Sequence, residues 1–141
     1  MTFPPVFAQI RKRPEMYLPA ATYEAAVSFV LGYDTAVNGG LLLGFREWLI
    51  TQLDEGNNQW WPALVLRVIE QPAIMTVSGE KSPTADEQRA ALEGLFNTLE
   101  TFLRERSQRG GIRRIFAAYE GWLHKQEWYD ASSADWIPPS P

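Results

Sequence analysis

The segment that most constrains the fold starts with a helix-capping motif and continues as an unbroken apolar stripe. Thr84 and Glu87 form a capping box, in which each side chain accepts a hydrogen bond from the other residue's backbone N–H. Large apolar residues then recur every three or four positions, as on one face of an α-helix. They are Leu92, Leu95, Phe96, Leu99, Phe102 and Leu103. A long helix with one continuous apolar face must bury that face against other elements.

The same spacing recurs in most of the remaining chain. Asn38-Gly39-Gly40 and Gly110-Gly111 mark two helix boundaries, because left-handed residues end helices and two glycines cost about 2 kcal/mol inside one. Prolines at positions 4 and 5 suit the first turn of a short helix. Helices are predicted over residues 5–12, 23–37, 42–53 and 112–123.

Residues 60–69, WWPALVLRVI, fit two kinds of element. Trp61, Leu64, Val65 and Val68 share a helical face, and Pro62 suits a first turn. The β-branched residues would also suit a buried strand. The pattern favours a helix, and a strand remains the alternative for these residues. The segment after them, up to Pro83, is predicted to be an irregular connection.

These elements predict an all-α fold, a compact bundle of five to six helices with little or no sheet. One helical domain is expected over residues 1–130, followed by an extended Pro/Ser-rich tail over 131–141 with Trp136 and Ile137 as anchors. The two stripes flanking Gly110 should pack antiparallel because their connection is short. The residues expected in that core are Leu95, Leu99, Phe102, Ile115, Phe116 and Tyr119.

The charge balance disfavours several classes of partner. The 13 Lys+Arg and 17 Asp+Glu give a formal charge of -4, which opposes general affinity for nucleic acid or an anionic membrane and suits a basic partner. Trp60–Leu66, the longest apolar run, is too short to span a bilayer, and the first ten residues lack the apolar core of a secretory signal. A cytoplasmic protein is therefore expected.

The chain offers no recognisable catalytic or metal-binding constellation. It has no cysteine and a single histidine, His124, whose neighbours in sequence supply no orienting acid. No group of Asp and Glu shows metal-ligand spacing, and no Gly-rich loop stands between a strand and a helix to cradle phosphate. The sequence predicts a protein that is not an enzyme and that uses no metal and no cofactor.

The stretch QIRKRPEMYL at residues 9–18 has two interpretations. Arg11 and Arg13 lie at a predicted helix end, where cations are favoured, and Pro14 fixes a turn. If the stretch is a structural corner, one arginine would form an ion pair with an acid of a neighbouring helix. Tyr17 would be at least half buried, and residues 16–18 would fold back onto the core as apolar plugs. Alternatively, Arg11, Arg13 and Tyr17 form an anion site.

A second basic group surrounds the Gly-Gly break, and it is either a solvated face or an anion site. Its members are Arg104, Arg106, Arg109, Arg113 and Arg114.

Ile10–Leu18 also resembles the start of the ATP-binding domain of type II DNA topoisomerases, which carries a similar Arg-Lys-Arg-Pro-Gly-Met-Tyr-Ile-Gly stretch. Here Glu15 and Pro19 stand where that family has glycines. The helix that follows lacks the family's paired Asp/Glu-Asn for Mg-ATP, and no Asp-Gly-x-Gly motif comes later. The resemblance is rejected as an indication of function.

A second resemblance covers residues 10–103. The order Ile-Arg-x-Arg-Pro-x-Met-Tyr-Leu, FVLGYDTA, GFREWL, WWPALVL and a long Leu/Phe helix is similar to that of small bacterial immunity-type proteins of polymorphic toxin systems. This resemblance implies a small cytoplasmic protein that neutralises a toxin by binding it, without catalysis.

Asp54, Glu55 and Trp60 are the candidate partner-binding residues, because they lie on a Gly/Asn-rich loop between two predicted elements. A tryptophan can bury a large area, and carboxylates can meet the basic groups that a nuclease toxin uses for phosphate. The alternative is that Trp60 packs into the core beside Trp61 and the acids are merely solvated. Two other functions stay open: an oligomerising or scaffold domain that closes a homodimer, and a small-molecule or phosphate binder using Arg11 and Arg13.

Overall fold

The computed structural model describes residues 1–75 and 82–129. Within these ranges the chain forms 6 α-helices and no strand, so the predicted all-α bundle is confirmed. The predicted tail at 131–141, with Trp136 and Ile137, lies outside the described residues.

The helices follow the predicted order closely. They are α1 (Pro5–Lys12), α2 (Tyr23–Ala36), α3 (Phe45–Leu53), α4 (Trp61–Val68), α5 (Ala85–Arg106) and α6 (Gly111–His124), with short 3₁₀ turns η1 (Pro14–Met16) and η2 (Pro72–Met75). Residues 61–68 form a helix and not a strand, so the favoured prediction for that segment is confirmed. The third helix begins at Phe45 and not at Leu42, because Gly44 has a left-handed φ of 87° and interrupts helical geometry there.

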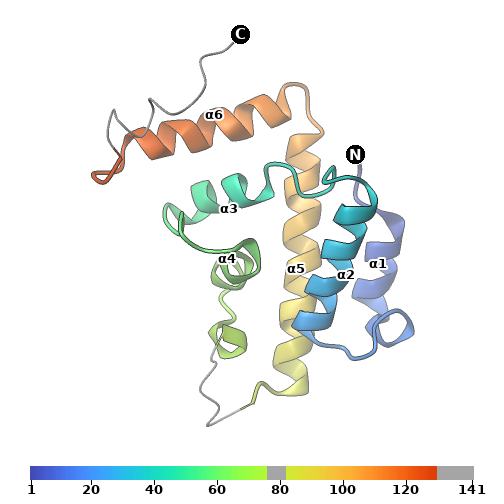
Figure 1. Cartoon of the computed structure of the whole chain (residues 1–141). Coiled ribbons are helices and arrows are strands. Elements are labelled where there is room, and N and C mark those ends of the chain that lie inside the picture. The colour runs from blue at the N-terminus through green and yellow to red at the C-terminus, as the bar shows by residue number, and fades with distance from the viewer. Residues whose placement is uncertain (76–81, 130–141) are drawn as a thin grey trace.

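The long helix α5 is the centre of the molecule. Its capping box forms as predicted, with the Thr84 side chain and the Glu87 side chain each accepting a backbone N–H. Figure 1 shows α1 and α2 on one side of α5, α3 and α4 on the other, and α6 across its C-terminal end. Because α5 contacts each of the other five helices, its apolar face is covered along its length.

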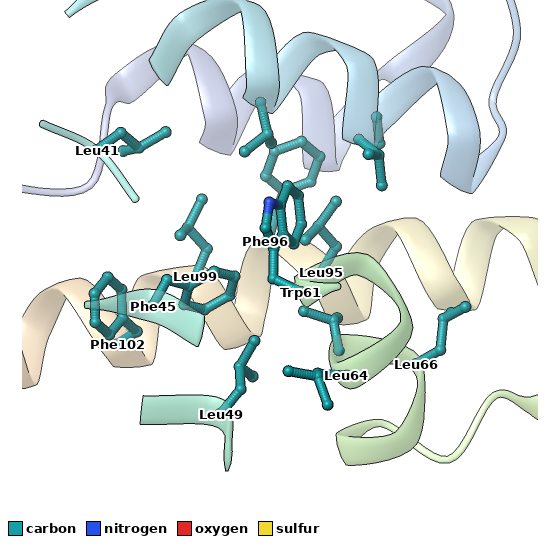
Figure 2. Close-up of a cluster of buried hydrophobic side chains, with 14 of the residues drawn as sticks. Leu41, Phe45, Leu49, Trp61, Leu64, Leu66, Leu95, Phe96, Leu99 and Phe102 are labelled. Carbon is teal, nitrogen blue, oxygen red and sulfur yellow. The ribbon is translucent and has the colours of Figure 1, made fainter. Parts of the chain in front are cut away.

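The core consists of aromatic and aliphatic side chains to which all six helices contribute, and Figure 2 shows the part of it around α5. The Phe45 ring lies 4.9 Å from Phe102 and 5.7 Å from Trp61, measured between centroids. On the other side of α5, Phe7 of α1 packs 5.3 Å from Phe96. Each fully buried side chain of this size contributes about 1.5–3 kcal/mol, so these contacts hold the bundle together.

The last helix does not pack as predicted. Instead of running back along α5, α6 crosses its end and packs mainly on α3 (Figure 1). Phe116 is therefore 37% exposed and Tyr119 is half-buried, whereas Ile115 is buried. Gly111 lies against the end of α5, where a Cβ would approach the carbonyl oxygens of Glu105 and Arg106 to 2.4 Å. A side chain at position 111 would not fit this close backbone contact, so glycine permits α6 to start there.

Arg106 and Asp34 hold the connection between α2 and α3. Arg106 donates to the carbonyl oxygens of Gly40, Leu41 and Leu43 at 2.8–3.0 Å. Asp34 accepts from the backbone N–H groups of residues 41 and 42. Partial burial lowers the pKa of Arg106, and the Asp34 charge opposes that shift. Arg106 thus has a structural role within the basic group around the Gly-Gly break.

Candidate functional site

The loop between α3 and α4, residues 54–60, presents the three candidate partner-binding residues. Trp60 is 61% exposed, whereas its neighbour Trp61 is buried in the core. The alternative in which Trp60 packs into the core is therefore wrong. Asp54 and Glu55 are also exposed. The chain places one large aromatic side chain and two carboxylates at the surface of a single loop.

Arginines of both flanking helices hold this loop. Arg46 of α3 donates to the backbone carbonyl oxygens of Asn57 and Gln59. Arg67 of α4 donates to the Gln59 side chain at 2.7 Å and forms an ion pair with Glu55. These contacts tie two backbone carbonyl groups and two side chains of the loop to the flanking helices.

The end of α6 forms the second wall of a cleft of about 420 Å³ beside this loop. The indole N–H of Trp122 donates to Asp54 Oδ1 at 2.7 Å, and the Tyr119 hydroxyl donates to Asn57 Oδ1 at 2.5 Å. The cleft is lined by Asp54, Glu55, Gly56, Asn57, Asn58, Trp122, Gln126 and Trp128. Trp60 is not among the lining residues, so the structure joins two of the three predicted residues in the cleft and leaves the third beside it.

The α6 residues of this cleft were missed by the sequence reasoning. Trp122 falls within the predicted helix 112–123, where its apolar spacing indicates a core residue, and the sequence gives no signal of a partner for its indole N–H. Trp128 is 58% exposed and follows a polar stretch, Lys125-Gln126-Glu127. Single exposed aromatic residues are common on protein surfaces, so the sequence around Trp128 gives no signal of a site.

The two arginines of the QIRKRPEMYL stretch do not converge. Arg11 donates to Glu100 and Asn97 of α5 at 2.9 Å, and its guanidinium lies 5.1 Å from the Phe3 ring centroid. Arg11 thus forms the ion pair with a neighbouring helix that the structural-corner interpretation predicts. Arg13 instead lines a separate open cleft with Lys12 and has no hydrogen bond or ion pair through its side chain within the described residues.

The apolar residues of the same corner are only partly covered. Tyr17 is 37% exposed, so more than half of it is buried, and its hydroxyl donates to Gln9. Leu18 is buried and acts as the predicted plug, but Met16 points to solvent. The 3₁₀ turn that starts at Pro14 is too short to return all three side chains to the core.

The remaining basic residues near the Gly-Gly break lie at the surface. Arg114 donates to the Arg109 carbonyl oxygen at 2.6 Å and so caps the turn between α5 and α6. Arg104, Arg109 and Arg113 are exposed. They do not gather around one pocket with Arg114 in the part of the chain that the structure describes.

His124 lies at the end of α6, where its ring contacts Tyr129 at a centroid distance of 4.9 Å. Among the described residues, no group of three or more His, Asp and Glu side chains is placed to hold a metal ion. Residues 1–75 and 82–129 also contain no helix with the length and apolar character needed to cross a bilayer.

Comparison with known proteins adds no assignment to this geometry. A scan against protein-family models, a search of curated proteins and a search of solved structures each gave no match to this chain. The cleft beside the α3–α4 loop and the exposed Trp60 are therefore the features on which a functional proposal rests.

Proposed function

We propose that this protein is a non-catalytic binding protein of the immunity type, which neutralises a basic toxin domain by covering it. The observation that carries the proposal is the α3–α4 loop, held by Arg46, Arg67 and α6 while it presents Trp60 to solvent. A loop that is already ordered loses little conformational entropy on binding, and an exposed tryptophan is a frequent energetic centre of an interface.

Charge supports the same kind of partner. The chain carries a formal charge of -4, and Asp54 and Glu55 lie at the rim of the cleft beside the loop. Opposite charges across an interface speed association and select the partner. A domain that binds phosphate through basic residues would present the complementary surface.

An oligomerising domain is the second candidate, and one observation favours it. Leu43, Ile112 and Phe116 are all exposed, and a Cβ at Gly44 would contact both Ile112 and Phe116. The exposed side chains of Ile112 and Phe116 thus lie beside Gly44 at the start of α3, and Leu43 is its neighbour in the chain. Size-exclusion chromatography with light scattering distinguishes a homodimer from a monomer, and Phe116→Ala should dissociate a dimer closed by this surface.

Co-expression tests the immunity-type proposal. The protein is expressed with the product of the gene adjoining its own, and growth is compared between wild type and the triple variant Asp54→Asn, Glu55→Gln, Trp60→Ala. Asn tolerates the left-handed φ of 59° at position 54, and the Glu55 change leaves the Arg67 charge unbalanced, which opposes a basic partner. We expect the wild type to restore growth and the triple variant to lose most of that protection.

The matched control is the triple variant Glu24→Gln, Glu93→Gln, Met16→Ala, which removes two exposed acids and one exposed apolar side chain away from both proposed surfaces. It should protect as the wild type does. Circular dichroism confirms that both variants fold. Protection that survives the loop variant would remove this surface from the proposal, and absence of protection by the wild type would remove the immunity-type function.

A further inference from the structure

The cleft beside the α3–α4 loop lies where two helices end. α3 ends at Leu53 with Asp54 as its C-cap, and α6 ends at His124 with Lys125 as its C-cap. Figure 1 shows both helices running in the same direction, and the hydrogen bond between Trp122 and Asp54 joins their ends. Helix C-termini carry partial negative charge from unpaired carbonyl groups, so two of them at one cleft favour a cation.

The lining side chains leave hydrogen-bond acceptors open. Asp54 uses Oδ1 for the Trp122 indole, and Oδ2 has no partner among the described residues. Gln126 donates through Nε2 to the Trp122 carbonyl oxygen at 2.8 Å, which leaves Oε1 free to accept. Glu55 is already paired with Arg67, so Asp54 is the lining carboxylate without a counter-ion in the described structure. The cleft therefore suits a ligand group rich in donors.

Two indoles supply a surface for a flat cation. The Trp122 and Trp128 rings lie 6.1 Å apart at an angle of 62°, and both line the cleft. Trp122 is fixed by Asp54 and by stacking on Tyr119, whereas Trp128 is 58% exposed. Guanidinium groups stack on indole faces while donating in their plane to carboxylates, a geometry that a lysine ammonium does not match.

We infer that this cleft is a binding site for an arginine side chain, with Asp54 Oδ2 and Gln126 Oε1 as acceptors and Trp128 as the stacking surface. That the arginine belongs to a basic protein partner rests on the proposed function. The affinity for a guanidinium rests on the cleft alone.

The test uses the full chain labelled with ¹⁵N and observes the indole N–H signals of its 6 tryptophans by NMR. N-acetylargininamide is titrated in, and N-acetylcitrullinamide, which has the same shape without the charge, serves as the matched ligand. The Trp122 and Trp128 signals should shift with the arginine compound and not with the citrulline compound, while the Trp60 signal stays in place. Asp54→Asn should weaken binding about tenfold, and Trp128→Ala about three- to tenfold.

Two controls separate the cleft from general charge and general aromatic surface. Glu93→Gln removes an exposed acid of α5, and Trp60→Ala removes the exposed tryptophan outside the cleft lining. Both should bind the arginine compound within about twofold of wild type, since neither touches the cleft. Asp54→Asn keeps the acceptor for Trp122 and suits the left-handed backbone, so the variant is expected to fold.

Equal shifts with the two compounds, no shift of Trp122 and Trp128, or unchanged affinity in Asp54→Asn would each overturn the inference. Its failure is distinguishable from that of the proposed function. Neutralisation of the partner without binding of the arginine compound removes only the arginine site. Binding of the arginine compound without neutralisation removes only the immunity-type function.

Discussion

At the scale of single residues, the conformation of the α3–α4 loop depends on Gly56. Its φ is +96°, a conformation that side chains disfavour, and a Cβ there would come within 2.5 Å of Leu64 Cδ2. The loop can approach α4 this closely only because residue 56 has no side chain.

Gly56→Ala should therefore destabilise the fold by about 1–3 kcal/mol, from backbone strain and the displaced Leu64. Urea unfolding measures the change. Gly121→Ala is the control, since nothing lies within 4 Å of a Cβ at that helical position. The control should gain roughly 0.5–1 kcal/mol from helix propensity. Equal stability of Gly56→Ala and wild type would show that the loop has another conformation available.

Tyr23 gives a prediction on pH dependence. The side chain is buried, its hydroxyl donates to the Pro62 carbonyl oxygen at 2.7 Å, and burial raises the pKa well above its ordinary value of 10.0. A raised folded-state pKa means that this residue's contribution is complete below about pH 10 and is lost as the pH rises further, because only the unfolded chain then releases the proton.

Tyr23→Phe removes both the hydrogen bond and the titration. At pH 8 the variant should be about 1 kcal/mol less stable than wild type, since the Pro62 oxygen loses its donor. Above pH 10 the wild type alone loses stability, at up to about 1.4 kcal/mol per pH unit. The difference in free energy of unfolding between the two proteins should therefore shrink and, at higher pH, reverse. Urea unfolding at pH 8 and pH 10.5 measures how far the difference shrinks, and a constant difference would contradict the buried, neutral Tyr23.

At the scale of elements, the helix starts depend on local chemistry. Thr22 accepts from the Ala25 N–H, Thr84 accepts from the Glu87 N–H, and prolines occupy the first turns of α1 and α4. The threonines satisfy N–H groups that no intrahelical carbonyl can reach, and the prolines have no N–H to satisfy. α5 has the fullest cap, which fits its role as the helix that every other helix contacts.

Thr84→Ala should cost about 1 kcal/mol, because the first turn of α5 loses its acceptor. Thr101→Ala is the matched change, at an exposed position where the hydroxyl only donates to the Asn97 carbonyl oxygen within the same helix. It should change the stability by less than about 0.5 kcal/mol, with any gain due to the better helix propensity of alanine. Thermal or urea unfolding of both variants provides the comparison, and equal losses would mean that the cap contributes nothing.

At the scale of the whole molecule, the contrast between α5 and α6 shows how far the core extends. Leu99 of α5 is fully buried, whereas Phe116 of α6 is 37% exposed although both belong to predicted apolar stripes. Leu99→Ala should destabilise by about 2–5 kcal/mol as a large-to-small change in a packed core. Phe116→Ala should cost less than about 1.5 kcal/mol, since little of a cavity forms at the surface. Similar losses in urea unfolding would indicate that α6 lies back along α5 after all.

The sequence by itself determined most of the elements, because the signals that start and stop a helix are local. The capping box of α5, the prolines at first turns and the glycines after the stripes lie within a few residues of the boundaries that they set. The start of α3 was misplaced by three positions because Leu42 fits the helical spacing while Gly44, with positive φ, breaks the helix. Apolar spacing alone does not show such a break.

Only the tertiary structure decided which face of each stripe is covered and which distant groups meet. Trp60 and Trp61 are the same residue type side by side, yet one is at the surface and one in the core, because Trp61 alone faces α3 across Phe45. The cleft likewise depends on Asp54 and Trp122, which are far apart in sequence and joined where α3 and α6 end together. That meeting follows from the direction in which α6 leaves α5 to pack on α3. The spacing of apolar residues along the chain does not specify this direction, because it shows which face of a helix is buried and not which helix buries it.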